Sequence, residues 1–148
     1  MFKNILVAVD LEHDTRVDDL LRVASDIANT YRSQVHLLNV VPAAPAVVSR
    51  FLPENYEKMA SREIEKDLAA LATKVDLAEG TAASSVRFGG IYQEILAHAD
   101  KIGADLIIVA SHKPDLGDFL LGTTAARIVR HASCSTLVIR QRRSVMGG

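Results

Sequence analysis

The sequence predicts a single α/β domain: a doubly wound, five-stranded, mostly parallel sheet with helices on both faces. Three observations support this. Five short apolar runs alternate with segments in which apolar residues recur every three or four positions. The resulting order, βαβαβαβαβ, implies right-handed crossovers between parallel strands. The length of 148 residues fits one domain. Periodicity alone leaves the strand order open.

The five expected strands are residues 5–9, 35–41, 83–88, 105–110 and 135–140. The first, second and fourth runs are nearly continuous in apolar residues, which is typical of strands covered on both faces. The third run is weaker and ends at Gly89 and Gly90.

Four helices are expected between these strands, and each has an apolar stripe. Stripe residues are Val17, Leu20, Leu21, Ala24, Ile27 and Ala28; Tyr56, Ala60, Ile64, Leu68, Leu71, Ala72 and Val75; Ile91, Ile95, Leu96 and Ala99; and Ala125, Ile128, Val129 and Ala132. Gly80 is expected to stop the second helix. Residues 42–53 hold three of the four prolines and predict a surface loop.

Composition excludes several classes of protein. The formal net charge of −1 gives no general attraction to nucleic acid or to membranes. No stretch approaches 18 apolar residues, and the first apolar run is too short for a signal peptide. Cys134 is the only cysteine, so no internal disulfide or thiolate metal cluster can form. We therefore expect a cytoplasmic domain over residues 1–140, with residues 141–148 as a frayed basic tail.

Candidate site residues follow the strands, because ligands of open parallel sheets bind beyond the carboxyl ends of the strands. The most informative segment runs from Ala110 to Thr124 and ends at a helix start, Gly122-Thr123-Thr124. Free N–H groups and the positive end of the helix dipole meet there, and Lys113 would add a charge. Local chemistry alone fits an ordinary capped helix and a phosphate site about equally well.

The chain resembles the universal stress proteins over nearly its whole length. The resemblance rests on residues 3–10, 36–40 and 88–90, and above all on 110–112 with 120–123, 128–132 and 136–140. It implies the strand order 3-2-1-4-5, ATP binding, and homodimers paired through strand five (135–140) or tetramers built from them. The implied nucleotide-binding residues are Ala8, Val9, Asp10, Val40, Ala110, Ser111, His112, Lys113, Gly122, Thr123 and Thr124.

One feature departs from the glycine pattern of the ATP-binding branch of that family. Ala110 and Lys113 stand where that pattern has glycines, and eight residues rather than nine separate Lys113 from Gly122. The sequence looks like a variant subgroup, some of whose members bind ATP. We expect this departure from the glycine pattern to affect the geometry around the phosphates more than ATP binding itself.

A metal site made by the protein alone is not expected, because the acidic side chains near Asp10 are adjacent loop residues that diverge. Mg²⁺ held mainly by ATP phosphates, with Asp10 nearby, fits better. The favoured function is an ATP-binding stress-response protein that acts as a nucleotide-dependent switch on an unidentified partner protein. The alternatives are a slow ATP hydrolase, for which Asp10 and His112 are the only candidate bases, and a nucleotide-free dimer that acts through protein contacts.

Overall fold

The computed structural model describes residues 1–11, 17–111 and 122–140; the expected tail, 141–148, lies outside them. The strands are β1 (Asn4–Ala8), β2 (Gln34–Val41), β3 (Ala83–Phe88), β4 (Leu106–Ala110) and β5 (Ser135–Ile139). The helices are α1 (Val17–Tyr31), α2 (Ala46–Ser49), α3 (Tyr56–Ala72), α4 (Ile91–Ile102) and α5 (Thr123–His131).

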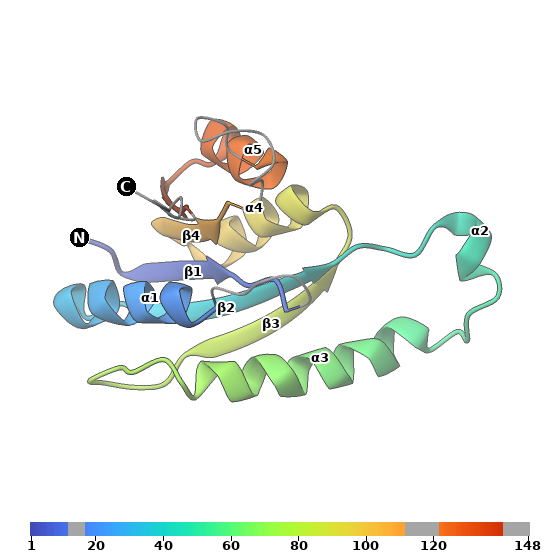
Figure 1. Ribbon diagram of the computed structural model, residues 1–148, viewed down its shortest axis with the longest axis horizontal. Helices are drawn as coiled ribbons and strands as arrows, with labels where there is room; N and C mark the ends of the chain where they lie inside the picture. Colours follow the sequence, from blue (N-terminus) through green and yellow to red (C-terminus); the bar gives the residue numbers. More distant parts are fainter. Residues whose placement is uncertain (12–16, 112–121, 141–148) are drawn as a thin grey trace, which may run out of the picture.

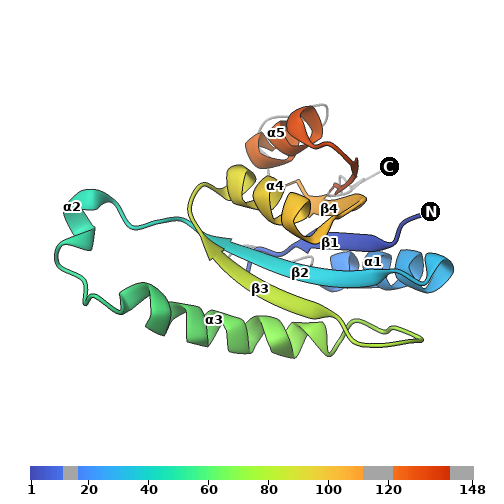
Figure 2. The ribbon, with the colours of Figure 1, turned by 180° about the vertical axis from the view of Figure 1, so that it is seen from behind.

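The five strands form one sheet in the order β3-β2-β1-β4-β5, and every neighbouring pair is parallel. This confirms the predicted fold class and the strand order that the resemblance implies. Helices α1 and α3 cover one face of the sheet, and α4 and α5 cover the other (Figures 1 and 2). The winding reverses between β1 and β4, so their carboxyl ends flank the crevice in which such folds bind ligands.

Two apolar layers hold the helices to the sheet, because successive side chains of a strand point to opposite faces. Ile5, Val7 and Leu37 pack with α1 and α3, whereas Leu6 and Leu38 pack with α4 and α5. All five side chains are buried to 1% exposure or less. This double burial explains why the central strands read as continuous apolar runs.

Two local predictions were wrong. Helix α3 ends at Ala72 rather than near Gly80, although the apolar spacing continues to Val75. Val75 is buried, but it reaches the core from a turn in which its N–H is bonded to the carbonyl oxygen of Ala72. Spacing alone cannot distinguish such a turn from a further helical turn. The expected loop 42–53 also contains the short helix α2, which begins after Pro45.

Residues 43–59, called the arm here, project from the body of the molecule (Figure 1). The arm starts where β2 ends, carries α2, and returns through the first turn of α3. Among the helices that the structure describes, none is both long and apolar enough to cross a membrane.

Candidate functional site

A pocket of about 230 Å³ lies at the carboxyl ends of β1, β2 and β4, beside the point where the winding reverses. Six of the predicted site residues line it: Ala8, Val9, Asp10, Val40, Ala110 and Thr124. Most of the lining side chains are apolar. The topology thus brings together residues from three strands and one helix that are far apart in the sequence.

Asn39 fixes the pocket wall, and the sequence analysis did not single it out. Its side-chain amide donates a hydrogen bond of 2.8 Å to the carbonyl oxygen of Val9. The backbone N–H of Val9 in turn donates to the carbonyl oxygen of Leu38 at 2.8 Å, so β1 stays tied to β2 beyond its last residue. Asn39 is only 7% exposed. The sequence did contain a signal, since Asn39 is a polar residue flanked by Leu38 and Val40 in a largely apolar strand, and a buried amide needs a hydrogen-bond partner.

Helix α4 supplies a second wall through Ile91 and Ile95, and α3 adds Ile64. Two glycines allow α4 to begin directly after β3. Gly89 has a φ of 145°, which favours glycine, and its N–H donates to the carbonyl oxygen of Val41 at 3.0 Å. A Cβ on Gly89 would lie 2.8 Å from a carboxylate oxygen of Glu94. The sequence showed the glycine pair, but it did not show that α4 would border the site.

The N-terminus of α5 is attached to the end of β4 by Ser111. The Gly122 N–H donates to Ser111 Oγ at 2.9 Å, and the Ser111 N–H donates to the carbonyl oxygen of Ile139 at 2.9 Å. The Ala126 N–H makes the first turn's bond to the carbonyl oxygen of Gly122 at 2.9 Å. The N–H groups of Thr123 and Thr124 therefore have no acceptor within the helix. His112 and Lys113 lie outside the described residues.

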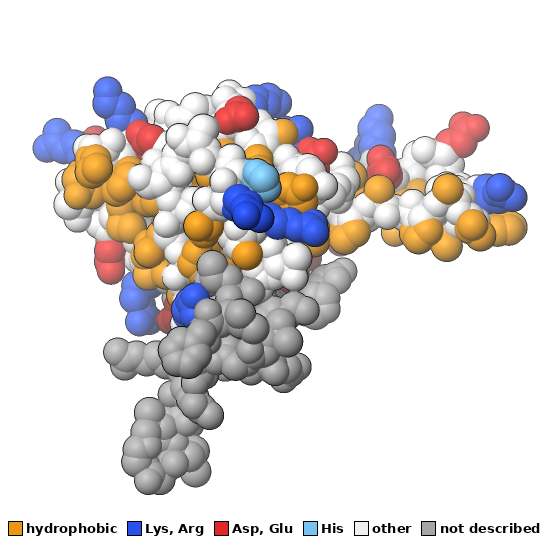
Figure 3. Space-filling view, turned by 90° about the horizontal axis from the view of Figure 1, so that it is seen from above, with side chains coloured by type: hydrophobic (Ala, Val, Ile, Leu, Met, Phe, Trp, Pro, Cys, Tyr) orange, Lys and Arg blue, Asp and Glu red, His pale blue; other side chains and the backbone are white. Residues whose placement is uncertain are grey.

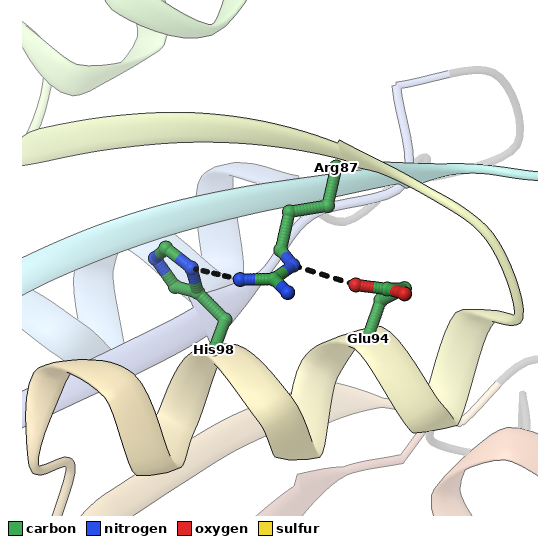
Figure 4. A network of polar contacts seen from close by, with 3 residues as sticks. All are labelled: Arg87, Glu94 and His98. Atoms are coloured by element: carbon green, nitrogen blue, oxygen red, sulfur yellow. Dashed lines mark hydrogen bonds and ion pairs between the residues drawn. The ribbon is translucent and has the colours of Figure 1, made fainter.

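A polar cluster holds α4 to β3 beside this pocket (Figure 4). Arg87 Nε lies 2.6 Å from Glu94 Oε2, and Arg87 Nη1 lies 3.3 Å from His98 Nδ1. Because a guanidinium group can only donate, His98 Nδ1 must accept and its ring is neutral in this arrangement. Burial lowers the pKa of His98, and the positive charges of Arg87 and Lys101, together with His36, lower it further.

His36 lies on β2, and burial lowers its pKa as well. Its Nε2 atom is buried and has no hydrogen-bond partner among the described residues. The half-buried His36 therefore also favours the neutral ring.

We expect the free energy of unfolding to fall as the pH drops below about 6.5, the ordinary pKa of histidine. Both folded pKa values lie lower, so the unfolded chain binds protons first and the loss continues until the folded pKa values are passed. His36→Leu removes one of the two groups. The difference in unfolding midpoint between pH 7.5 and pH 5 should therefore be smaller in this variant than in the wild type.

Urea titrations at the two pH values provide the measurement. His131→Gln is the matched control, because His131 is exposed on α5. An acid loss that is identical in His36→Leu and in the wild type would show that His36 does not contribute.

No group of three His, Cys, Asp or Glu side chains within the described ranges is placed to hold a metal ion. Cys134 is half-buried, and burial raises the pKa of its thiol, with further contributions from Asp105 and Asp100. The thiol is therefore protonated at neutral pH, which makes it a poor nucleophile.

Known proteins resemble this chain along nearly its whole length. The model of the universal stress protein family matches residues 1–140. Universal stress protein G of Escherichia coli O157:H7 is 29% identical over 143 residues, which cover 95% of this chain and 100% of that protein.

Three solved structures share the fold at lower sequence identity. A hypothetical protein whose biochemical function was assigned from its structure has a TM-score of 0.79 at 20% identity, over 97% of this chain and 99% of that one. A universal stress protein in complex with cAMP has a TM-score of 0.65 at 15% identity, over 93% and 97%. The universal stress protein of Archaeoglobus fulgidus in complex with dAMP has a TM-score of 0.62 at 18% identity, over 93% and 97%.

The family match spans the strands, the pocket and the start of α5 alike. The chain therefore belongs to the universal stress protein family.

Proposed function

We propose that this chain binds an adenine nucleotide, with ATP as the favoured ligand, and that the bound nucleotide acts as a switch on a partner protein. The observation that carries the proposal is an apolar pocket that opens beside the N-terminus of α5. An apolar cavity takes a base and ribose, whereas a helix N-terminus takes phosphates. Few other small-molecule classes combine these two parts.

The size of the pocket fits the nucleoside part of such a ligand. Ligand pockets usually measure about 300–1,000 Å³, so a pocket of about 230 Å³ accepts a base with part of its ribose. Val40 and Ala8 would face the base, and Asp10 would lie near the ribose. The phosphates would extend outward over Thr123 and Thr124, where N–H groups and hydroxyls can donate to them.

Two observations on other proteins support an adenine nucleotide over other nucleotides. Solved universal stress proteins of the same fold are complexes with cAMP and with dAMP. Mg²⁺ would be held mainly by the phosphates, with the carboxylate of Asp10, which lines the pocket, as a further oxygen donor.

A homodimer through β5 is part of the proposal. β5 is an edge strand that pairs only with β4 among the described strands. Unpaired edges are templates for pairing with another chain, and a second copy would close this one. Such a dimer in the cytoplasm would give the partner protein a surface that changes with the nucleotide state, provided that the nucleotide binds two states with different affinity.

The direct test is to denature the purified protein and separate any released nucleotide by chromatography. Calorimetry with ATP, ADP and AMP, with and without Mg²⁺, then gives the affinities. We expect ATP to bind with a dissociation constant below 1 mM, which corresponds to more than about 4 kcal/mol. The absence of released nucleotide and of any binding at millimolar ATP would reject the proposal.

Lys113 offers a test of the part of the proposed site that would hold the phosphates of the nucleotide. The sequence places this lysine where a glycine stands in the family pattern, which exchanges close backbone approach for a positive charge. We expect Lys113→Ala to weaken ATP binding more than ADP binding, because the terminal phosphate loses its cation. Equal weakening of both ligands, measured by calorimetry, would show that Lys113 does not reach that phosphate.

A further inference from the structure

We propose that the arm, residues 43–59, is an interface that pairs with the arm of a second copy of this chain about a two-fold axis. The first observation is the apolar surface of the arm. Phe51 is 82% exposed, Val47 70% and Met59 55%. Val48 at 47% and Tyr56 at 40% complete the set. Figure 3 shows hydrophobic side chains along one side of the projecting arm.

The stripe of α3 explains why this surface is uncovered. Leu68, Ile64, Ala60 and Tyr56 recur every four residues, so they lie on one face of the helix. Leu68 is fully buried against the sheet, Ile64 and Ala60 are half-buried, and Tyr56 is exposed. Exposure along this stripe therefore rises from Leu68 towards the arm, and the apolar face of the helix is least covered at its N-terminus.

The patch supplies part of the area that one half of an interface needs. Aromatic side chains bury about 150–250 Å² each, and a specific interface buries about 800 Å² per partner. Phe51 and Tyr56, with Val47, Val48 and Met59, supply a substantial share of that area. Contiguous apolar patches of this kind mark interaction sites on proteins in water.

Charge identifies the second copy as the occupant. The arm carries two cations, Arg50 and Lys58, and two anions, Glu54 and Glu57, and all four side chains are exposed. Their sum is zero, so two arms do not repel each other as wholes. In a two-fold interface each contact occurs twice with the roles exchanged, so the cations of one arm can face the anions of the other in both halves. A strongly charged partner would leave half of these groups facing like charge.

The arm also lies away from the other proposed interface. It follows β2 and projects beyond the end of the sheet on the side of β2 and β3, whereas β5 is the opposite edge of the sheet (Figure 1). One chain can therefore use both interfaces at once, and arm pairing would join two β5 dimers into a closed tetramer. The inference does not depend on nucleotide binding or on the β5 dimer.

The first test is the mass of the assembly by sedimentation velocity, with the fold checked by circular dichroism. We expect Phe51→Glu and Val48→Glu to halve the mass of the wild-type assembly, from tetramer to dimer or, if β5 does not pair, from dimer to monomer. Val129→Glu is the matched control, because Val129 is 49% exposed on α5, close to the 47% of Val48. It should leave the mass unchanged.

A charge exchange distinguishes a second copy from any other occupant. The double variant Arg50→Glu/Lys58→Glu makes all four arm charges negative, and Glu54→Lys/Glu57→Lys makes them all positive. Each variant alone should lose arm pairing. An equal mixture of the two should recover the wild-type mass, because a negative arm meets opposite charges on a positive arm however the two are aligned.

Two outcomes would overturn the inference. One is a wild-type mass that Phe51→Glu and Val48→Glu leave unchanged, as expected if the arm folds onto its own chain or contacts a different protein. The other is a mixture of the two charge variants that stays at half the wild-type mass.

Discussion

Ala8→Leu is expected to lower the affinity for ATP by about 100-fold, or about 2.8 kcal/mol at about 1.4 kcal/mol per factor of ten. Ala8 is the last residue of β1 and lines the pocket from below the proposed position of the base. A leucine there places three more carbon atoms in a cavity of only about 230 Å³. Calorimetry with ATP measures the effect.

Ala126→Leu on α5 is the matched control, because the same side chain is added at an exposed position. Both variants should keep the wild-type circular dichroism spectrum, and only Ala8→Leu should lose nucleotide. Unchanged ATP binding in a folded Ala8→Leu protein would mean that the nucleotide binds elsewhere.

Asn39→Leu is expected to reduce the free energy of unfolding by about 1–3 kcal/mol, the range for a buried polar group that loses its partner. The variant removes the amide that donates to the carbonyl oxygen of Val9, and both Asn39 and Val9 are almost fully buried. Since Val9 and Asn39 also line the pocket, ATP affinity should fall in the same variant. Urea titration and calorimetry measure the two effects.

Asn29→Leu is the control for that variant. Asn29 makes two comparable bonds, donating to the carbonyl oxygen of Asp76 at 2.7 Å and accepting from the Ala78 N–H at 2.8 Å. Because Asn29 is exposed, water can replace these bonds and the loss should stay below 1 kcal/mol. Equal losses in the two variants would show that burial does not set the cost of removing Asn39.

The position of α4 links the pocket to the polar cluster behind it. Ile91 and Ile95 line the pocket, and Glu94 and His98 of the same helix contact Arg87 of β3. One helix therefore contacts both the pocket and the sheet through different side chains.

Local sequence determined most of the fold and part of the site. Alternating apolar runs and helical stripes fixed the α/β class, because a strand covered on both faces must be apolar at nearly every position. The rule that parallel strands present their carboxyl ends to a ligand then selected Asp10 and Ala110, which line the pocket. Ala8 and Val9, which also line it, came from the family resemblance. The strand order came from family resemblance rather than from periodicity.

Tertiary structure decided what depends on contacts between distant segments. The pocket wall made by Ile64, Ile91 and Ile95 arises only when α3 packs on β3 and β2 and α4 packs on β2 and β1. Val75 extends the apolar spacing of α3 but packs from a turn, and Tyr56 extends the same stripe to a point where the sheet has ended. The sequence pattern of a segment indicates which of its faces is apolar. Only the packed chain determines what covers that face, because burial depends on segments that the local pattern does not contain.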